Sequence, residues 1–393
     1  MMLRSKAKNG TNIPAPDQNK KRKQETQQAE FIVHPTEPQP KKAPSKGLSE
    51  LSNGILDFQI DSTKRVSKAP IKEEKENANP TVNKAAPQGV DAIQLSSNPT
   101  DPCPNFDYDA EEAGNPDSVS EYAMDIFRYY KSREKHFRIA DYRAKHPKIE
   151  PTTRAILVDW LVELQETFEL NHETLYNTVK ILDIYLTNTE NFMTPEELQR
   201  IACGAMFVAA KFDERGPPII EDILYMANDR FDREVLFATE RDVFKTINFD
   251  LGAPLSYRYL RRLGRVTRLD MATLTLARYL LEMSLLVYEY ALVSSSRMAA
   301  AAYLLAMKMK DPAFKWTPVL EKYSGYKGSD VVPLMEHLNH SIIYIKRNWQ
   351  QLNNIRDKYA HDVFFNASLV KLPEDTTGVA PNVIGPLPQM SYP

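Results

Sequence analysis

The amino-acid sequence predicts an all-α protein with two tandem bundles of five helices, preceded by an additional helix and a long disordered tail. Apolar residues recur at helical spacing from about residue 118 to 366, glycines are few there, and the apolar pattern occurs twice. The chain has 393 residues, of which 42% are hydrophobic, so it is long enough to bury two cores.

Start and stop signals divide the first half of this region into five helical segments. Thr194 is suited to cap a helix whose first turn contains Pro195. After the stretch LGAP at 251–254 the order begins again. The signals predict a helix that begins at Pro151 and further helices within 171–186, 194–214, 217–227 and 232–249.

The second half repeats the first at a nearly constant offset. The stretch TLYNTVKILDIYL from Thr174 precedes TLTLARYLLEMSL from Thr273 by 99 residues, and IACGAMFVAAK from Ile201 precedes MAAAAYLLAMK from Met298 by 97. Equal offsets indicate a duplicated unit. Small residues in the second pair let neighbouring helices approach closely, which predicts a central helix in each bundle.

Composition sets the expected domain boundaries. Residues 1–117 hold 13 of the 27 prolines and no tryptophan, so we expect a disordered tail that cannot bury enough apolar surface to fold. We expect the additional helix and first bundle in 118–254, the second bundle in 255–370, and a flexible C-terminal tail in 371–393.

Several functional classes lack support in the sequence. There is no phosphate-binding loop, nucleophile elbow, dinucleotide fingerprint or metal-spaced histidine pair, so we expect a non-catalytic protein without cofactor or metal. The two cysteines, 100 residues apart, and the absence of a signal peptide or long apolar run favour a soluble protein of the cytosol or nucleus, with no membrane partner.

The stretch TRAILVDWLVE, residues 153–163, is apolar around most of a helix. Its apolar arc is about 260° wide on a helical wheel, far more than the roughly 100° of an ordinary surface helix. Two interpretations remain open: a fully buried central helix, or a helix with one face on the core and one exposed docking face, formed by Ile156, Leu157 and Trp160 and bordered by Glu163.

This stretch resembles the first helix of the cyclin box, and the duplicated unit resembles the two boxes of the cyclin fold. The resemblance continues through ETLYNTVKILDIYL, LQRIACGAMFVAAKFDE, PPIIEDILYM and ERDVFKTINFDLGAP and covers roughly residues 119–365. KFDERGPPIIEDILYM and LSYRYLRRLGR look most like the third subtype of the B-type mitotic cyclins. The resemblance implies a regulatory subunit that binds and activates a cyclin-dependent kinase.

The resemblance also implies which residues bind the kinase. Lys211 and Glu240 match the family's hydrogen-bonding pair, although each could equally be a solvated surface charge, and Phe249 and Leu251 match apolar contacts that ordinary interdomain packing would also explain. The stretch EYAMDIFRYY places three apolar side chains on one stripe of the helix before the first box, which touches the kinase in the family: Tyr122, Ile126 and Tyr129.

The family resemblance implies a docking site for substrates with a basic residue and a leucine, on Ile156, Leu157, Trp160, Glu163, Leu198 and Gln199. Thr153 stands where the family has an apolar Met, so we expect a shallower site than in A-type cyclins. Arg154 on the same helix needs a counter-ion when buried, and Asp183 occupies the position that supplies it in cyclins.

The tail contains motifs of periodic destruction and of nuclear import. KENANP, with Lys75, Glu76 and Asn77, has the form of a motif read by the anaphase-promoting ubiquitin ligase, and SKGLSELSN resembles a destruction box with Leu48 and Asn53 but with Ser45 in place of its arginine. The basic run KKRK at residues 20–23 predicts a nuclear location, although such a run can also be solvating charge.

An arginine stripe in YRYLRRLGRVTR leaves two alternatives. Arginines recur there at helical spacing, which fits either a solvated face or a surface that binds phosphorylated substrates, and the residues concerned are Arg258, Arg261, Arg262 and Arg265, joined by Arg278 of the next helix. A nucleic-acid-binding factor of the same fold is the alternative function, but residues 118–370 hold 33 basic and 33 acidic side chains, and this neutrality argues against a nucleic-acid partner.

Overall fold

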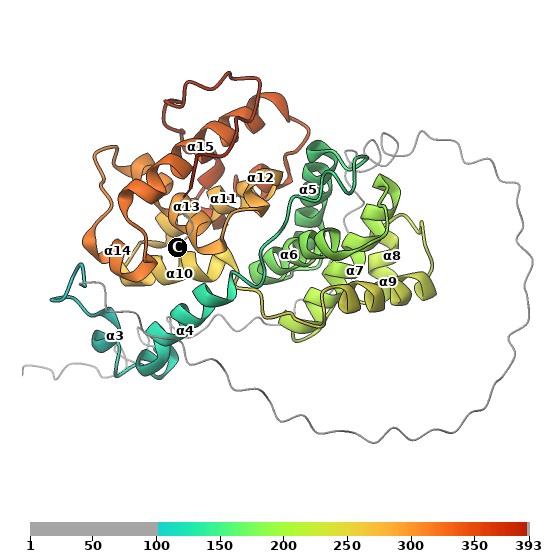
Figure 1. The fold of residues 1–393 in the computed structure, drawn as a ribbon, viewed down its shortest axis with the longest axis horizontal. Coiled ribbons are helices and arrows are strands. Elements are labelled where there is room, and N and C mark those ends of the chain that lie inside the picture. The colour runs from blue at the N-terminus through green and yellow to red at the C-terminus, as the bar shows by residue number, and fades with distance from the viewer. Residues whose placement is uncertain (1–100, 391–393) are drawn as a thin grey trace, which may run out of the picture. The chain divides into compact units, whose positions relative to one another are not determined.

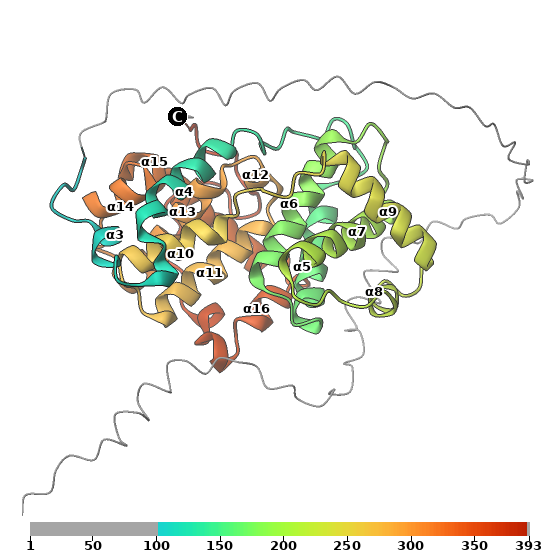
Figure 2. The same cartoon turned by 90° about the horizontal axis from the view of Figure 1, so that it is seen from below.

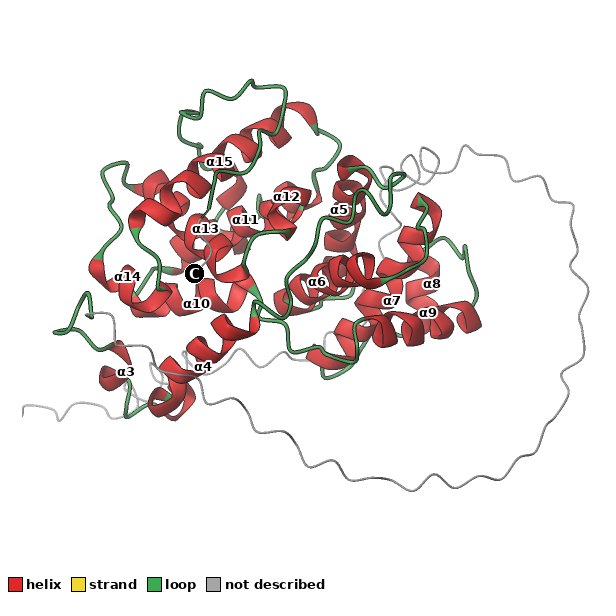
Figure 3. Cartoon of the chain, in the orientation of Figure 1, coloured by secondary structure: helices red, strands yellow, loops and turns green. Residues whose placement is uncertain are grey.

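The computed structural model describes residues 101–390, and all regular structure in this part is helical (Figure 3). The first predicted bundle is present, with α7 packed against α5, α6 and α9 (Figure 1). Its helices are α5 (Pro151–Thr167), α6 (His172–Asn188), α7 (Pro195–Asp213), α8 (Ile220–Met226) and α9 (Arg233–Thr246).

Helix α7 begins and packs as its sequence predicts. The Thr194 side chain accepts from the backbone of Glu197, whose carboxylate in turn accepts from the Thr194 amide, so the first turn is closed by a capping box. In the middle of the helix, a Cβ added to Gly204 would lie 2.8 Å from Cγ2 of Thr239 on α9. The absence of a side chain at this position therefore lets α7 and α9 approach closely.

The second bundle repeats this arrangement around α13. That helix packs against α10, α11, α14 and α15, as expected for the counterpart of α7. A short helix, α12 (Tyr288–Ala291), was not predicted. The main helices are α10 (Ser256–Val266), α11 (Met271–Leu285), α13 (Ser295–Lys310), α14 (Pro318–Ser324) and α15 (Gly328–Asn348).

The additional helix α4 (Ser120–Arg133) lies against the second bundle (Figure 2). Just beyond its end, the Glu134 carboxylate accepts from the amide and the hydroxyl of Ser296, at 2.6 and 2.8 Å, in the first turn of α13. A carboxylate is favourable there because the amides of a first helical turn carry partial positive charge. Glu134 therefore fixes the C-terminal end of α4 to α13.

The prediction that the disordered tail extends to residue 117 was wrong for its last part. Residues 101–117 include α3 (Tyr108–Glu111), and Asp101 forms a 2.8 Å ion pair with Lys322. Asp109 pairs with Arg262 of α10. The composition of the whole tail concealed this short acidic and aromatic stretch, which is held by basic residues of the second bundle and not by a core of its own.

The prediction of a flexible C-terminal tail was wrong for residues 371–390. His340 of α15 bonds through its two ring nitrogens to the Asp375 carboxylate, at 2.6 Å, and to the Val383 carbonyl, at 2.8 Å. His337 bonds in the same way to the Gly385 carbonyl, at 2.9 Å. The sequence of this segment shows no helical periodicity. Its order comes instead from side chains of α15, which bond to its backbone and hold it in an irregular path.

Candidate partner-binding surface

Helix α4 presents two tyrosines to solvent. Tyr122 is 60% and Tyr129 is 58% exposed, and Ile126 between them is partly exposed, so the predicted stripe lies on the outer face of the helix. On another face, the ring of Phe127 packs against the ring of Tyr259 on α10, with centroids 5.9 Å apart. Packing of α4 on the second bundle thus leaves the tyrosines available to a partner.

The turn that ends α9 exposes a third aromatic ring. Asn248 and Phe249 have φ angles of 55° and 60°, a left-handed conformation that residues other than glycine rarely adopt. Phe249 is 61% exposed, although its ring also contacts that of Phe244, and Leu251 after it is partly buried against the core. Strained backbone of this kind is often found at functional sites, which makes the turn a candidate contact.

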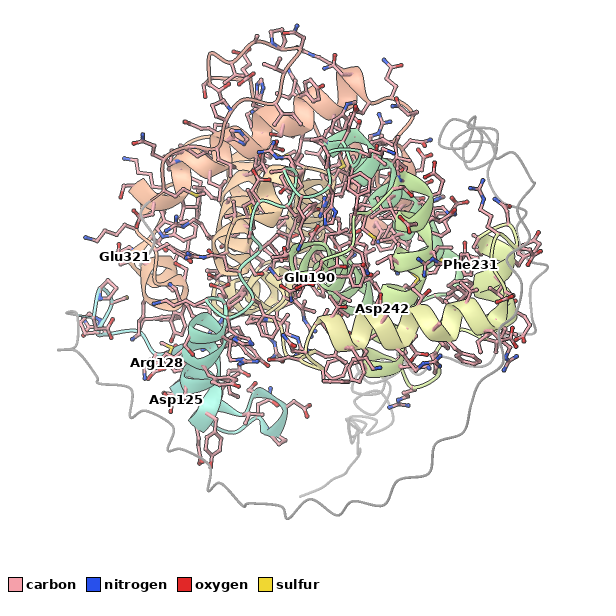
Figure 4. The ribbon with its side chains drawn as sticks, turned by 45° about the vertical axis from the view of Figure 1, so that its right-hand side comes forward. Asp125, Arg128, Glu190, Phe231, Asp242 and Glu321 are labelled. Atoms are coloured by element: carbon pink, nitrogen blue, oxygen red, sulfur yellow. The ribbon has the colours of Figure 1, made fainter. Side chains whose placement is uncertain are left out.

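An ion pair connects α4 to the turn that ends α9. Arg133 at the end of α4 bonds to Asp250 of the α9 turn at 2.6 Å. Earlier on the same helix, Asp125 and Arg128 form an exposed ion pair of their own (Figure 4). Lys211 of α7 and Glu240 of α9 are bonded to each other at 2.8 Å, and the Lys211 ammonium lies 3.9 Å from the centre of the Phe207 ring. The two residues predicted to bind the kinase are therefore already paired, and a partner must extend or replace this pair.

Three exposed apolar residues near Lys211 were not predicted. Phe212 directly follows Lys211, and Ile219 and Tyr225 follow in and after the loop to α8; all three are exposed. Their signal in the sequence was a set of large apolar residues beside charges, glycine and proline, where a core is not expected. They are further candidate contacts in the stretch of chain that follows Lys211.

The expected docking face on α5 is largely buried. Leu157, Trp160 and Leu198 are only 6%, 4% and 1% exposed, whereas Ile156, Glu163 and Gln199 are partly exposed. Helix α5 contacts α6, α7, α12 and α16 (Asn354–Lys358), so it is covered on several sides. Of the two interpretations of its wide apolar arc, the buried central helix is the correct one, and the prediction of exposed Leu157 and Trp160 was wrong.

The structure contains the predicted ion pair between Arg154 and Asp183. The guanidinium donates to both carboxylate oxygens, at 2.8 and 2.7 Å, and both side chains are buried. Arg154 also donates to the carbonyl of Leu285 in the second bundle, and the Tyr142 hydroxyl donates to Asp183. Burial alone would lower the pKa of Arg154, but Asp183 and Tyr142 together raise it, so this arginine stays charged.

The α10 arginines do not form the predicted uniform stripe. Arg262 is buried, pairs with Asp109 and lies within 6 Å of the rings of Tyr108, Phe127 and Tyr323, so it is unavailable to a phosphate. Of the others, Arg258, Arg261 and Arg265 are exposed, with Arg261 paired to Glu173, and Arg278 lies over the rings of Tyr359 and Phe364. The predicted stripe is interrupted because an acidic residue of the segment 101–117, Asp109, pairs with Arg262 of this helix.

Two further properties can be described for residues 101–390 only. No group of three or more potential metal ligands is found there, and no helix in this range is long and apolar enough to span a bilayer. Lys75, Glu76 and Asn77, the destruction-box residues Leu48 and Asn53, and the basic run at 20–23 lie outside the described residues.

Two family models and several known proteins match this chain. Residues 125–252 match the model "Cyclin, N-terminal domain" and residues 254–373 match "Cyclin, C-terminal domain". The chain is 50% identical over 397 residues to a G2/mitotic-specific cyclin-B3 of Caenorhabditis elegans, with all of both chains covered. It is 45% identical to the cyclin-B3 of Gallus gallus, over 67% of this chain and 64% of that relative.

A more distant relative and a solved structure also match. The chain is 33% identical to a G2/mitotic-specific cyclin-B of Hydra vulgaris, over 84% of this chain and 87% of the relative. A viral cyclin from herpesvirus saimiri matches with a TM-score of 0.46 and 21% identity, over 61% of this chain and 99% of that one.

Proposed function

Because this chain belongs to the cyclin family and matches a mitotic B-type member over its full length, we propose that it binds a cyclin-dependent Ser/Thr kinase and activates it at mitosis. The identification as a B-type mitotic cyclin of the third subtype is confirmed by the cyclin-B3 relatives. Cyclins are regulatory subunits, so the phosphoryl-transfer chemistry belongs to the partner. The chain acts by position: it holds the kinase's regulatory helix inward, so that the kinase's own lysine–glutamate pair forms.

The observation that carries this proposal is the exposed surface of α4 and of the turn that ends α9, together with the Lys211–Glu240 pair on α7 and α9. It exposes large rings at Tyr122, Tyr129 and Phe249, although such rings are normally buried unless a partner covers them. A central apolar region bordered by charges is the arrangement of a protein–protein interface. Exposed aromatic anchors of this kind dominate binding energy in such interfaces.

The test is co-purification of the tagged full chain from mitotic and interphase cells, with identification and assay of the bound kinase. We expect Phe249→Ala to reduce kinase recovery at least tenfold, because it removes an exposed anchor at little cost in stability. The matched control is Val363→Ala, which removes another exposed apolar side chain far along the sequence. Equal kinase recovery by wild type and Phe249→Ala, or recovery of no kinase, would contradict the proposal.

Substrate docking is proposed only for the accessible edge of α5. Glu163, Ile156 and Gln199 are partly exposed there, and a carboxylate suits the basic residue of a substrate. We expect Glu163→Lys to reduce phosphorylation of a basic-leucine peptide several-fold while leaving phosphorylation of a peptide without the motif unchanged. A parallel loss on both peptides would instead indicate impaired kinase activation.

Regulated destruction and nuclear import are proposed for the N-terminal part of the chain. Lys75, Glu76 and Asn77 form the KEN motif, to which the anaphase-promoting ligase would bind, and the KKRK run at residues 20–23 would direct nuclear import. We expect replacement of the three KEN residues by Ala to prolong the half-life at mitotic exit several-fold. Unchanged decay in synchronised cells would exclude this motif as the main signal, and an unchanged nuclear fraction after neutralising KKRK would exclude import by that run.

A further inference from the structure

A cationic cavity lies between the two bundles and α4, away from the α10 arginines. Its volume is about 320 Å³, and it is lined by the last two turns of α4 and the segment after it, by α6, and by the residues that lead into α13. Five basic side chains border it, and Glu134 is the one acidic residue of its lining; the basic residues are Arg128, Lys131, Lys135, Arg138 and Lys180.

Lys180 is the distinctive group of this cavity. Among residues 101–390, no hydrogen bond or ion pair joins its ammonium group to another side chain, and burial lowers its pKa. Its nearest anions, Asp183 and Glu134, are already bound by Arg154 and Ser296. The protein therefore keeps a partly buried ammonium beside a cavity without giving it a direct partner, which is unfavourable unless a ligand supplies the missing charge.

Of the other basic groups, some are held by contacts within the protein and some are exposed to solvent. Lys131 donates to the Ser324 carbonyl at 3.0 Å and lies over the Tyr326 ring, so it is held in place. Lys135 and Arg138 are exposed at the entrance. Exposed positive charge attracts an anion from solution, and the partly buried Lys180 binds it more strongly than a fully exposed lysine would.

The rest of the cavity lining consists of apolar side chains and serine hydroxyl groups. Phe137, Ile139, Leu292 and Val293 supply apolar contact, and the hydroxyl groups of Ser294 and Ser295 lie at the same cavity. A wholly inorganic anion would leave the apolar wall unused. A phosphate group attached to a short carbon chain would meet both the cations and the apolar side chains.

We propose that this cavity binds a phosphate monoester, in the form of a phosphorylated serine of a partner peptide, with Lys180 as its principal ligand. Lys135 at the entrance assists capture, and the apolar wall contacts the carbon atoms of the phosphorylated residue. The ligand carries about two negative charges near neutral pH and is attracted by the lining, where basic residues outnumber the single acidic residue, Glu134. Helix α4 contributes to both this site and the candidate kinase-binding surface, but through different side chains, and the binding of a phosphorylated peptide does not depend on the proposed function.

The test is isothermal titration calorimetry with the full chain, at one fixed low ionic strength. Three ligands are compared: acetyl-Ala-phosphoSer-Ala-amide, its unphosphorylated form and inorganic phosphate. We expect the phosphopeptide to bind, the unphosphorylated peptide not to bind, and inorganic phosphate to bind at least threefold more weakly. Lys180→Gln should weaken phosphopeptide binding at least tenfold, and Lys135→Gln about threefold. The Lys135 variant keeps the test informative if Lys180→Gln does not fold, since Lys135 is exposed.

The matched control is Arg265→Gln, which removes one exposed positive charge from α10 and should leave phosphopeptide binding unchanged. Loss of binding in this variant, with binding intact in Lys180→Gln, would overturn the proposal in favour of the α10 surface. Equal affinity for inorganic phosphate and phosphopeptide would overturn the assignment to a peptide, because the apolar wall would then contribute nothing.

Discussion

At the scale of single residues, Asp159 is an unusual carboxylate in the middle of α5. It is 2% exposed; it accepts a long 3.4 Å bond from the Asn354 amide, and its Oδ1 atom has no hydrogen-bond partner within residues 101–390. Burial raises its pKa to about 7, against the weaker opposing effect of the backbone amides of Asn354 and Ile355. In the folded protein this aspartate therefore holds a proton near neutral pH.

The sign of the resulting pH dependence follows from linkage. An unfolded aspartate titrates near pH 4, so the folded state binds the proton more tightly, and the free energy of unfolding falls as the pH rises from about 4 to 7. Asp159→Asn removes this titration. We expect the variant to be more stable than wild type by about 2 kcal/mol at pH 8 and to lose that advantage at pH 5.

Thermal unfolding of both proteins at pH 5 and pH 8 measures this difference. Glu196→Gln is the control, since Glu196 is an exposed carboxylate of the first bundle and its neutralisation should have nearly the same effect at both pH values. A stability difference between Asp159→Asn and wild type that stays constant with pH would show that Asp159 is charged in the folded protein.

At the scale of elements, sequence periodicity predicted the helices well and the irregular segments poorly. Thr194 and Pro195 marked the start of α7, and the two repeats matched α6 with α11 and α7 with α13, because local preferences and core packing agree there. Residues 371–390 have no such agreement. Their order comes from His337, His340 and Asn339 of α15, which hold backbone carbonyls that carry no sequence signal.

The candidate surface was predictable to a similar degree. Tyr122, Tyr129 and Phe249 came from the family resemblance and are exposed, but helical spacing alone could not decide which side of α5 was free. A 260° apolar arc fits a buried helix and a two-faced helix equally well. The answer depended on α12 and α16, short elements that contact α5 and that periodicity did not predict.

The C-terminal segment should contribute to stability as an element. Removal of residues 371–393 exposes the polar atoms of His337 and His340, and it deletes the apolar side chains of Leu372, Ile384 and Leu387, which pack against the core. We expect a loss of about 3 kcal/mol in the free energy of unfolding, from two lost hydrogen-bonded histidines and the lost apolar burial. Urea unfolding followed by circular dichroism measures it.

Removal of residues 391–393 alone is the matched control for that truncation and should leave stability unchanged. An unchanged unfolding midpoint after removal of residues 371–393 would mean that the segment is flexible in solution, as the composition predicted.

At the scale of the whole molecule, one buried polar cluster joins the two bundles to the C-terminal region. Glu282 of α11 bonds to Lys358 of α16 at 2.7 Å, accepts from the Tyr359 hydroxyl and lies 3.2 Å from His172 at the start of α6. Lys358 also donates to Gln165 of α5. Burial would raise the pKa of Glu282, but Lys358 and His172 together outweigh it, lower the pKa and hold the carboxyl ionised.

This cluster should decide whether the two bundles unfold together. Glu282→Gln leaves the buried Lys358 without its counter-charge, which typically costs about 3 to 5 kcal/mol. The loss falls on contacts that cross from one bundle to the other, so we expect the single unfolding transition of wild type to separate into two. Fluorescence of Trp160 in the first bundle, with Trp316 and Trp349 replaced by Phe, and far-ultraviolet circular dichroism of the same protein would then report different urea midpoints.

The double variant Glu282→Gln/Lys358→Met distinguishes charge imbalance from lost packing. If the cost arises from the unpaired ammonium, replacing Lys358 by an apolar side chain of similar length should restore at least half of the lost stability and bring the two midpoints together. If the double variant is less stable than Glu282→Gln, the contacts of Lys358 with Gln165 and the surrounding rings must dominate. Coincident midpoints in Glu282→Gln itself would mean that the bundles are coupled elsewhere, with Arg154 and its bond to the Leu285 carbonyl as the next connection to test.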